Sequence, residues 1–230
     1  MKPLVIGHRG ASAYALENTL GSFRLAVEMG ADMVELDVHE SRDGEFIVIH
    51  DRDLRRISGK KDIVQKTHSK ILRSIELYNK ERPLLLQEAF DLLPATIGMM
   101  VELKSIRSYQ KLANFIAARA KERSVILTSF DLSLIKRVQE YSPSIPLGIV
   151  SRTLTNIAKA NRMGINFEHV CLDFQALNPG TIKHLRLHNM KIFAWTVDRI
   201  EDIRRIIELD IDGIISNRPD EVRRVLDQVK

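Results

Sequence analysis

Short apolar runs alternate with amphipathic stretches along most of the chain. Between the runs, apolar residues recur at the three- and four-residue spacing that predicts a helix with one buried face, as in "LIKRVQE" and "DIRRIIE". From residue 99 onward a new run begins roughly every two dozen residues, the length of one strand, one helix and two short loops. The pattern therefore predicts repeated strand–helix units, with strands at 3–7, 33–38, 46–50, 99–104, 124–130, 146–151, 170–174, 191–197 and 212–216.

The number of these units predicts the fold. The run at 46–50 follows 33–38 so closely that we expect the two to form a hairpin, which leaves eight main strands. Eight strand–helix units in 230 residues predict a closed (β/α)8 TIM barrel, an α/β fold, with a doubly wound sheet as the alternative. Residues 51–98 are expected to be an insertion between the second and third main strands with one or two helices, including "LLLQEAFDLL". No linker divides residues 1–230, which predicts a single domain.

Helix-capping patterns support this division of the chain. Asn178 precedes Pro179, a sequence that predicts an N-cap followed by proline at the first helical position. Asp198 to Glu201 has the spacing of a capping box with aspartate as the cap. Pro219 is expected to open the last helix.

Composition and charge narrow the class of protein. The chain is 44% hydrophobic and 28% charged, and it contains no apolar stretch of the roughly 18 residues that span a bilayer, so we expect a cytoplasmic protein without integral membrane association. A single cysteine, Cys171, excludes an internal disulfide and fits a reducing compartment. The formal net charge of +5 is spread over predicted helices, where we expect solvated faces; an anionic substrate is the alternative. No cluster of basic and aromatic residues predicts nucleic-acid binding.

Two predicted barrel strands carry charged residues where apolar ones are expected. In "MVELDV" the alternation of a strand places Glu35 and Asp37 on one face, and in "MMVELK" it does the same for Glu102 and Lys104. Three converging carboxylates and one lysine leave two negative charges, which a divalent cation would neutralise. Oxygen ligands of this kind favour Mg²⁺ or Ca²⁺ over zinc. The alternative is that these carboxylates lie at strand ends and pair with Arg9 or Lys104.

Two histidines end predicted strands on the side where barrel active sites are built. His8 closes the first run and is followed by Arg9, and His50 closes "FIVIH" and is followed by Asp51. Histidine titrates near neutrality, so a pair can supply one general base and one general acid. The guanidinium of Arg9 fits phosphate oxygens. Together these residues predict metal-assisted cleavage of a phosphoester, although barrel isomerases and aldolases also use a metal and a lysine.

The string "GHRGASAYALENTLGSF…GADMVELDVHESRDGEFIVIHD" resembles the N-terminal signature of the glycerophosphodiester phosphodiesterase family. The likeness continues through "VELK", "TSFD", "AWTVD" and "DGIISNRPD" to the C-terminus. The resemblance implies a hydrolase of lipid and glycerol metabolism that converts small glycerophosphodiesters to sn-glycerol 3-phosphate and an alcohol with one divalent cation, Mg²⁺, Ca²⁺ or Mn²⁺. It implies three groups of site residues: catalytic His8 and His50; substrate-binding Arg9, Lys104 and Trp195; and metal-binding Glu35, Asp37 and Glu102.

The resemblance also suggests supporting residues. Glu17 in "ENT" is expected to orient His8 or Arg9, and Asn18 and Asp51 belong to the same motifs. Trp195 fits the mouth of the active site in the family, and a core aromatic residue is an equal alternative. The chain has Leu16 where the family commonly has proline, and "RPLLLQE" where it commonly has a "PTLEE"-like string, so the shape of the leaving-group pocket is open.

Several points stay open in the sequence. The related phosphoinositide-cleaving barrels suggest the 2-hydroxyl of glycerol as nucleophile, but the pattern does not assign acid and base to the two histidines. The apolar "PLLL" run keeps a lysophospholipase D-type activity open, while a phosphate-binding barrel without catalysis is disfavoured because no histidine or metal carboxylate is missing. Gly7 and Gly10 are expected to let the backbone approach the substrate phosphate. A monomer and a homodimer are both compatible with the sequence.

Overall fold

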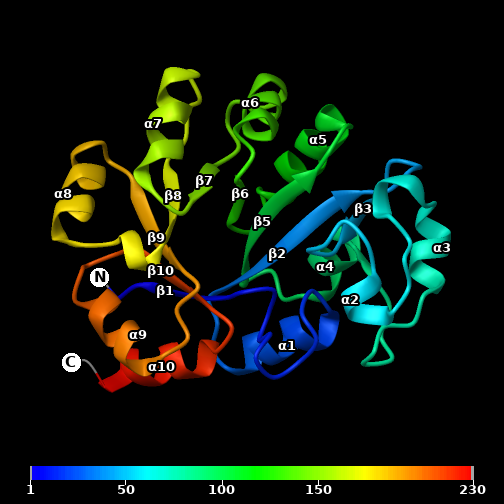
Figure 1. Ribbon diagram of the computed structural model, residues 1–230, viewed down its shortest axis with the longest axis horizontal. Helices are drawn as coiled ribbons and strands as arrows, with labels where there is room; N and C mark the ends of the chain where they lie inside the picture. The colour runs from blue at the N-terminus through cyan, green and yellow to red at the C-terminus, as the bar shows by residue number, and fades with distance from the viewer. Residues whose placement is uncertain (1, 229–230) are drawn as a thin grey trace.

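The computed structural model describes residues 2–228, in which eight parallel strands close into a barrel (Figure 1). Closure occurs at β1, which pairs in register with β10 on one side and with β2 on the other. The remaining strands follow in the order β10, β9, β8, β7, β6, β5 and β2, which confirms the (β/α)8 prediction. The barrel strands are β1 (Leu4–Gly7), β2 (Met33–Glu40), β5 (Gly98–Ser105), β6 (Val125–Ser129), β7 (Leu147–Ser151), β8 (His169–Asp173), β9 (Lys191–Trp195) and β10 (Gly213–Ser216).

One helix follows each barrel strand and covers its outer side, because each helix has an apolar face to bury against the strands (Figure 1). A short 3₁₀ turn at Phe174–Ala176 precedes α8. None of these helices combines the length and the apolar character needed to cross a membrane. The helices are α1 (Leu20–Glu28), α4 (Leu86–Leu92), α5 (Tyr109–Arg119), α6 (Leu132–Tyr141), α7 (Leu154–Arg162), α8 (Pro179–Leu187), α9 (Ile200–Ile207) and α10 (Pro219–Gln228).

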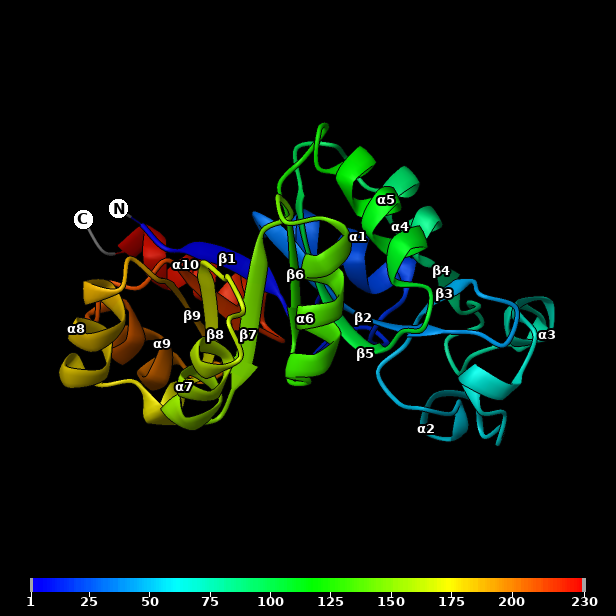
Figure 2. The same ribbon diagram turned by 90° about the horizontal axis from the view of Figure 1, so that it is seen from above.

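The chain between β2 and α4 forms the insertion. Strand β3 (Phe46–Val48) pairs antiparallel with β2, as the hairpin prediction expected, and β4 (Leu84–Leu85) pairs with β3. Helices α2 (Arg55–Ser58) and α3 (Ser69–Ser74), with a 3₁₀ turn at Val64–Lys66, lie outside the barrel beyond the end of β2 (Figure 2). They enclose a small apolar cluster of their own: Ile47, Ile49, Leu54, Ile57, Val64, Leu72, Ile75 and Leu77.

Residues 51–98 therefore contain three α-helices in place of the one or two expected. The third, α4, packs beside α5 through an edge-to-face contact between Phe90 and Phe115, whose ring centroids lie 5.4 Å apart. This contact places α4 in the outer layer of the barrel. The run "LLLQEAFDLL" thus supplies a barrel helix, and α2 and α3 are the additional ones.

Two of the three capping predictions are confirmed. The side chain of Asn178 accepts a hydrogen bond from the amide of Thr181 at the start of α8, and Pro219 opens α10. The third prediction is wrong, because Arg199 occupies the N-cap position of α9 without a side-chain hydrogen bond. The Asp198 carboxylate instead accepts hydrogen bonds from the end of β10, which lies beside β9 in the sheet.

The barrel interior changes from apolar to charged along the direction of the strands. Each of the eight strands contributes one residue to a single apolar layer: Ile6, Met33, Met100, Ile126, Val150, Cys171, Phe193 and Ile215. Side chains two residues further along a strand point to the same face, one step nearer its C-terminal end. Glu35 and Glu102 stand in that position above Met33 and Met100. The apolar layer therefore closes the base of the charged site.

Asp43 links the β2–β3 turn to the insertion. Its carboxylate accepts hydrogen bonds from the amide and hydroxyl of Ser69, at 2.8 and 2.7 Å, and from the hydroxyl of Ser41 at 2.9 Å. Burial opposes ionisation, but the hydrogen bonds from Ser69 outweigh it and hold the pKa of Asp43 below its usual 3.8. The lowered pKa means that ionised Asp43 stabilises the folded chain above about pH 4 and that this contribution disappears as the pH falls further.

We expect Asp43→Ala to lower the free energy of unfolding by about 1 kcal/mol near neutral pH, the size of a lost helix-start interaction. The difference from the unsubstituted protein should shrink as the pH falls below about 4, because protonation removes the same hydrogen-bond acceptor. Urea unfolding at several pH values from neutral to below 4 measures this difference in unfolding free energy. Glu76→Ala removes an exposed carboxylate from the same insertion and is the control; an equal cost at every pH would contradict the role given to Asp43.

Candidate active site

Most of the charged residues singled out in the sequence line one cavity at the C-terminal end of the barrel. The cavity has a volume of about 240 Å³. Asp37 lies just beneath it, 1% exposed. The walls include seven of the residues singled out in the sequence: His8, Arg9, Glu35, His50, Glu102, Lys104 and Trp195. Residues that are up to 187 positions apart in the chain thus meet at the ends of neighbouring strands, which is where barrel enzymes hold their catalytic groups.

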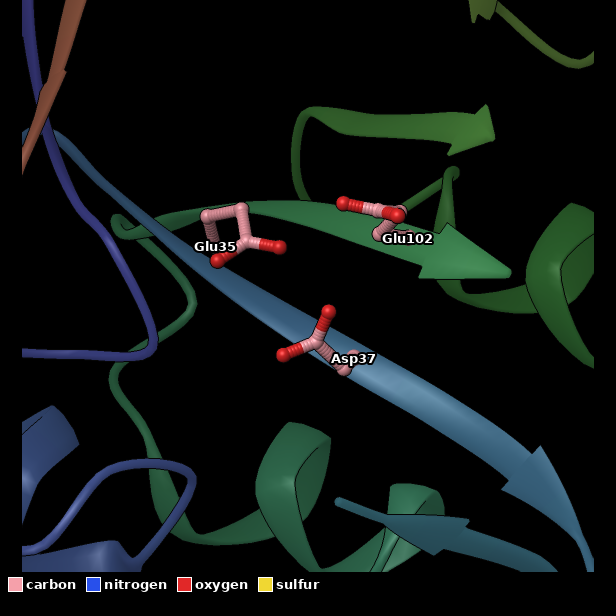
Figure 3. A group of neighbouring side chains, drawn as sticks. All are labelled: Glu35, Asp37 and Glu102. Atoms are coloured by element: carbon pink, nitrogen blue, oxygen red, sulfur yellow. The ribbon is translucent and has the colours of Figure 1, made fainter. Parts of the chain in front are cut away.

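Three buried carboxylates converge at the base of the cavity, and Figure 3 shows how they lie relative to one another. Glu35 and Asp37 project from β2 and Glu102 from β5, and the three side chains point toward one another. One oxygen from each lies within 4.8 Å of the others. The register explains this proximity, because Asp37 pairs directly with Glu102 across the two strands.

The carboxylates are incompletely neutralised by the chain itself. Burial, followed by the charges of Asp37 and Glu102, raises the pKa of Glu35 well above its usual value. Burial and Asp37 raise the pKa of Glu102 to about 7. Burial acts in the same direction on Asp37, but Lys104 and Arg9 outweigh it and lower the pKa of that carboxyl. Two of the three groups therefore lack the positive charge needed to keep them ionised at low cost.

These features fit a divalent cation. The Glu35 Oε1 atom is buried and has no hydrogen-bond partner among the described residues. The Asp37 Oδ1 atom, also buried, lies 3.0 Å from the Lys104 Nζ atom without the geometry of a hydrogen bond. An all-oxygen set of carboxylates is the donor type preferred by hard cations such as Mg²⁺, Ca²⁺ and Mn²⁺. The three residues named in the sequence as metal ligands are thus placed where they can hold one.

Arg9 and Lys104 flank the carboxylates, so the strand-end ion pairs considered as an alternative also form. The Arg9 Nε atom lies 3.1 Å from Asp37 Oδ2. The backbone amide of Arg9 donates to Glu35 Oε2 at 2.9 Å. Lys104 pairs with both Asp37 and Glu102. These pairs do not exclude a cation, because the free oxygen of Glu35 remains.

The turn after β1 holds Arg9 in place. Arg9 and Gly10 both have positive φ, at 53° and 86°. A Cβ atom on Gly10 would meet the backbone of Ser22 at 2.6 Å, and one on Gly7 would meet the Cβ of Ala26 at 2.9 Å. Both neighbours belong to α1, so these glycines permit close packing of the turn on that helix. Their closeness to a substrate phosphate stays a prediction.

Two of the supporting residues contact charged groups of the site, and one of them, Glu17, contacts Arg9 as expected. The Glu17 carboxylate accepts hydrogen bonds from Arg9 at 3.2 and 3.3 Å. Asn18 donates to Asp37 Oδ2 at 2.8 Å and accepts from the amide of Asp37 at 3.2 Å. Together they fix one cation and one carboxylate of the site. Their functional roles stay predictions.

His8 is oriented by a chain of hydrogen bonds from the other end of the sequence. The Asn217 side chain donates from Nδ2 to the Asp198 carboxylate at 2.6 Å, so its Oδ1 atom faces His8. This oxygen lies 2.7 Å from His8 Nδ1, which must therefore carry the proton. Burial and the neighbouring Arg9 charge lower the pKa of His8 to about 4. The histidine is thus neutral at physiological pH, with a free lone pair on Nε2.

His50 has the opposite kind of partner. Its Nδ1 atom lies 2.8 Å from the Asp51 carboxylate. Arg56 of α2 donates to Asp51 at 2.7 Å and, with two further bonds, to Glu17. The backbone carbonyl of His50 lies 3.0 Å from Nε2 of His39 on β2. The carboxylate oxygen accepts from Nδ1, so Nε2 is the ring nitrogen left for a substrate.

Trp195 lies at the cavity wall and is partly buried. Its indole nitrogen donates to the carbonyl of Cys171 at 2.9 Å. Its ring meets Phe130 edge to face at 5.4 Å. The residue also packs against the apolar layer of the barrel, so both sequence interpretations describe part of its environment.

Sequence reasoning missed Asn217, Asp198, Arg56 and His39 as site residues. Each lies in or near a stretch that the sequence had singled out. Asp198 ends "AWTVD" and Asn217 lies in "SNRPD". Arg56 follows "HD" by five residues, and His39 continues the charged strand at 33–40. None carries an unusual local pattern. Asn217 and His39 contact a histidine directly, and Asp198 and Arg56 act one contact further away, through Asn217 and Asp51.

Comparisons with known proteins agree with this geometry. Residues 8–221 match the model of the glycerophosphoryl diester phosphodiesterase family. A glycerophosphodiester phosphodiesterase of Caldanaerobacter subterraneus subsp. tengcongensis is 33% identical over 235 residues, which cover 96% of each chain.

Solved structures give the same result. The crystal structure of a glycerophosphodiester phosphodiesterase from Thermotoga maritima has a TM-score of 0.82 and 27% identity, covering 98% of this chain and 99% of that one. A phosphodiesterase of Oleispira antarctica, solved in complex with the product sn-glycerol-3-phosphate, has a TM-score of 0.88 and covers 98% of this chain and 97% of its own. At 22% identity the second likeness supports the fold alone.

Proposed function

The chain belongs to the glycerophosphoryl diester phosphodiesterase family, and on that premise we propose that it hydrolyses glycerophosphodiesters to sn-glycerol 3-phosphate and an alcohol. The observation that carries this proposal is the single cavity in which His8 and His50 face the carboxylate cluster, Arg9 and Lys104. It contains the groups needed to hold a phosphodiester and to move two protons. We further propose that a divalent cation is bound by Glu35, Asp37 and Glu102.

Binding of the phosphate needs positive charge at the cavity. Arg9 and Lys104 supply two fixed charges, held by the ion pairs with Asp37 and Glu102. A divalent cation held by Glu35, Asp37 and Glu102 would supply further positive charge to the phosphate and make the phosphorus more electrophilic. The guanidinium of Arg9 donates from several nitrogens at once, which orients the phosphate as well as attracting it.

His8 is the general base in this scheme. The Asn217 oxygen holds the proton on Nδ1, so Nε2 is the atom that accepts a proton from the nucleophile. Its low pKa keeps it unprotonated, which is the state a base requires. Asp198 acts only through Asn217, by fixing the orientation of the amide.

His50 is the general acid. Asp51 accepts from Nδ1 and orients the ring, so Nε2 is the atom that delivers a proton to the departing alcohol oxygen. Burial acts against ionisation of Asp51, but hydrogen bonds from Arg56 and His50 lower its pKa below the usual value, so the carboxylate stays charged. Through Asp51, Arg56 of the insertion thus helps to orient the imidazole of His50.

The proton transfers balance over two steps. In the first, the 2-hydroxyl of glycerol gives its proton to His8 and attacks phosphorus, while His50 protonates the leaving alcohol and a cyclic phosphate forms. In the second, His50 takes a proton from water, water opens the ring, and His8 returns its proton to the 2-hydroxyl. Both histidines end in their starting states.

The apolar run that kept a lysophospholipid substrate open does not form a lipid groove. Leu84 and Leu86 are buried in the core, at 9% and 1% exposure, and Pro83 is buried beside them. The observations therefore favour a water-soluble diester.

The proposal is tested by incubating the protein with glycerophosphoethanolamine and Mg²⁺, Mn²⁺ or Ca²⁺ and separating the products. We expect equal amounts of sn-glycerol 3-phosphate and ethanolamine. Phosphoethanolamine would mean that the other ester bond is cleaved. Lysophosphatidylethanolamine serves as the comparison substrate, and faster cleavage of it would refute the preference for a soluble diester.

A further inference from the structure

A groove leads away from the active-site cavity between the ends of β6 and β7. It has a volume of about 630 Å³ and shares His50, Lys104, Phe130 and Arg152 with the cavity, so the two are continuous. Arg152 follows β7 directly, at the start of the connection to α7 (Figure 1). A substrate bound at the cavity can therefore extend into this groove.

The groove adjoins the acid and not the base. His50 lines it, whereas His8 lines a separate hollow with Asn217 and Ser12. In the order of the closed sheet, β7 lies across the barrel from β1, which carries His8. The alcohol that receives the proton of His50 must lie on the side of His50. The groove beside β7 is thus in position for the leaving group.

The walls of this groove carry one positive charge without compensation, that of Arg152, because Lys104 is already paired with Asp37 and Glu102. Lys104 and Arg152 line it, and no aspartate or glutamate does so in the described part of the chain. Arg152 is exposed, and among residues 2–228 its guanidinium has no carboxylate within ion-pair distance. Thr153, Thr155 and Asn156 add neutral hydrogen-bonding groups.

A second hollow beside His50 differs from the groove in the balance of its charges. It lies over the start of the insertion, and two of its three arginines are paired: Arg55 with Asp53 at 3.8 Å, and Arg56 with Asp51 and Glu17. Arg52 also lines it, beside the carboxylates of Asp51 and Asp53. Of these two hollows, the groove beside β7 is the one that has an arginine and no carboxylate among its described lining residues.

The aromatic residue of the groove is a poor site for a cationic alcohol. The Lys104 ammonium already lies 5.9 Å from the centroid of the Phe130 ring. Trp195 contacts the same ring edge to face. A quaternary ammonium group placed over Phe130 would therefore meet the like charge of Lys104.

We propose that this groove binds the leaving alcohol and that Arg152 selects alcohols carrying a negative charge, such as a second phosphodiester. The inference rests on the proposed phosphodiesterase activity. The Arg152 side chain pairs with the anionic group of the alcohol, while Arg9 and Lys104 hold the phosphate that is cleaved. Exposure of Arg152 limits the strength of this pair and makes it sensitive to salt.

The test compares two diesters that release the same product. In 1,3-bis(sn-glycero-3-phospho)glycerol the leaving alcohol carries a phosphodiester anion, and in glycerophosphocholine it carries a cation. We expect kcat/KM to be higher for the anionic alcohol at low ionic strength. In Arg152→Gln the ratio of the two kcat/KM values should fall about tenfold, with Arg152→Lys restoring most of it, because the effect comes from charge at the rim of a binding site.

Arg162→Gln is the matched control, since it removes an exposed arginine from the C-terminal end of α7, the helix that follows Arg152, and should leave the ratio unchanged. An equal loss for both substrates in Arg152→Gln would assign Arg152 to the cleaved phosphate and overturn the proposal. A fall of the kcat/KM ratio in Arg162→Gln as well would mean that the preference comes from the overall charge of the protein, which would also overturn the proposal. Cleavage of both diesters without preference would refute the inference alone, whereas cleavage of neither would refute the proposed function.

Discussion

Replacing His8 with alanine is expected to lower the rate of the first chemical step by about 10²- to 10⁴-fold while leaving the fold intact. The base would be lost, and only a short hydrogen-bonded network with Asn217 and Asp198 would be disturbed. His50→Ala should cause a loss of similar size with natural diesters. Initial rates and circular dichroism measure the two quantities. His184→Ala, which removes an exposed histidine on α8, should change neither.

The leaving group distinguishes the acid from the base. A 4-nitrophenyl ester of sn-glycerol 3-phosphate releases a stable anion that needs no proton. In a single turnover His50→Ala should therefore release 4-nitrophenolate nearly as fast as the unsubstituted protein, whereas His8→Ala should remain slow. The reverse pattern would exchange the two roles, and full activity of either variant with natural diesters would remove that histidine from the mechanism.

Removal of divalent cations is expected to abolish activity, and adding Mg²⁺, Mn²⁺ or Ca²⁺ should restore it. The cation should also stabilise the fold, because it relieves the repulsion among Glu35, Asp37 and Glu102. At a concentration about 100 times Kd this linkage amounts to about 2.7 kcal/mol, a shift of several degrees in Tm. Thermal unfolding with and without the cation measures it independently of turnover.

Glu102→Gln should lose both the activity and most of the cation-dependent rise in Tm. Without a cation, the variant should be at least as stable as the unsubstituted protein, because one of three crowded, buried carboxylates is gone. Glu140→Gln, at an exposed position on α6, should behave like the unsubstituted protein. A cation-dependent rise in Tm that survives in Glu102→Gln would exclude this residue as a ligand.

The barrel could be predicted from the sequence because its strands and helices are encoded by local periodicity. Each apolar run gave a strand, and Asn178 gave a cap, since both depend on residues only a few positions away. The same reasoning wrongly predicted Asp198 as the N-cap of α9. Its spacing fits a capping box, but its carboxylate is occupied by Asn217, which is remote in sequence and adjacent in the sheet.

The insertion was less predictable for a related reason. Helices α2 and α3 have only four and six residues, too few to show a clear helical period. Their apolar residues form a cluster with Ile47 and Ile49, which precede them in the chain. The tertiary contact, more than local propensity, gives these short helices their stability.

The sequence by itself determined which residue types stand at the ends of which strands. Glu35, Asp37 and Glu102 interrupt apolar strands, and His8 and His50 end others, so a charged site at one end of a barrel followed from alternation and order alone. Only the tertiary structure decided what His8 can do. The Asn217 amide that holds the proton of His8 on Nδ1 lies 209 positions away and is brought there by closure of the barrel.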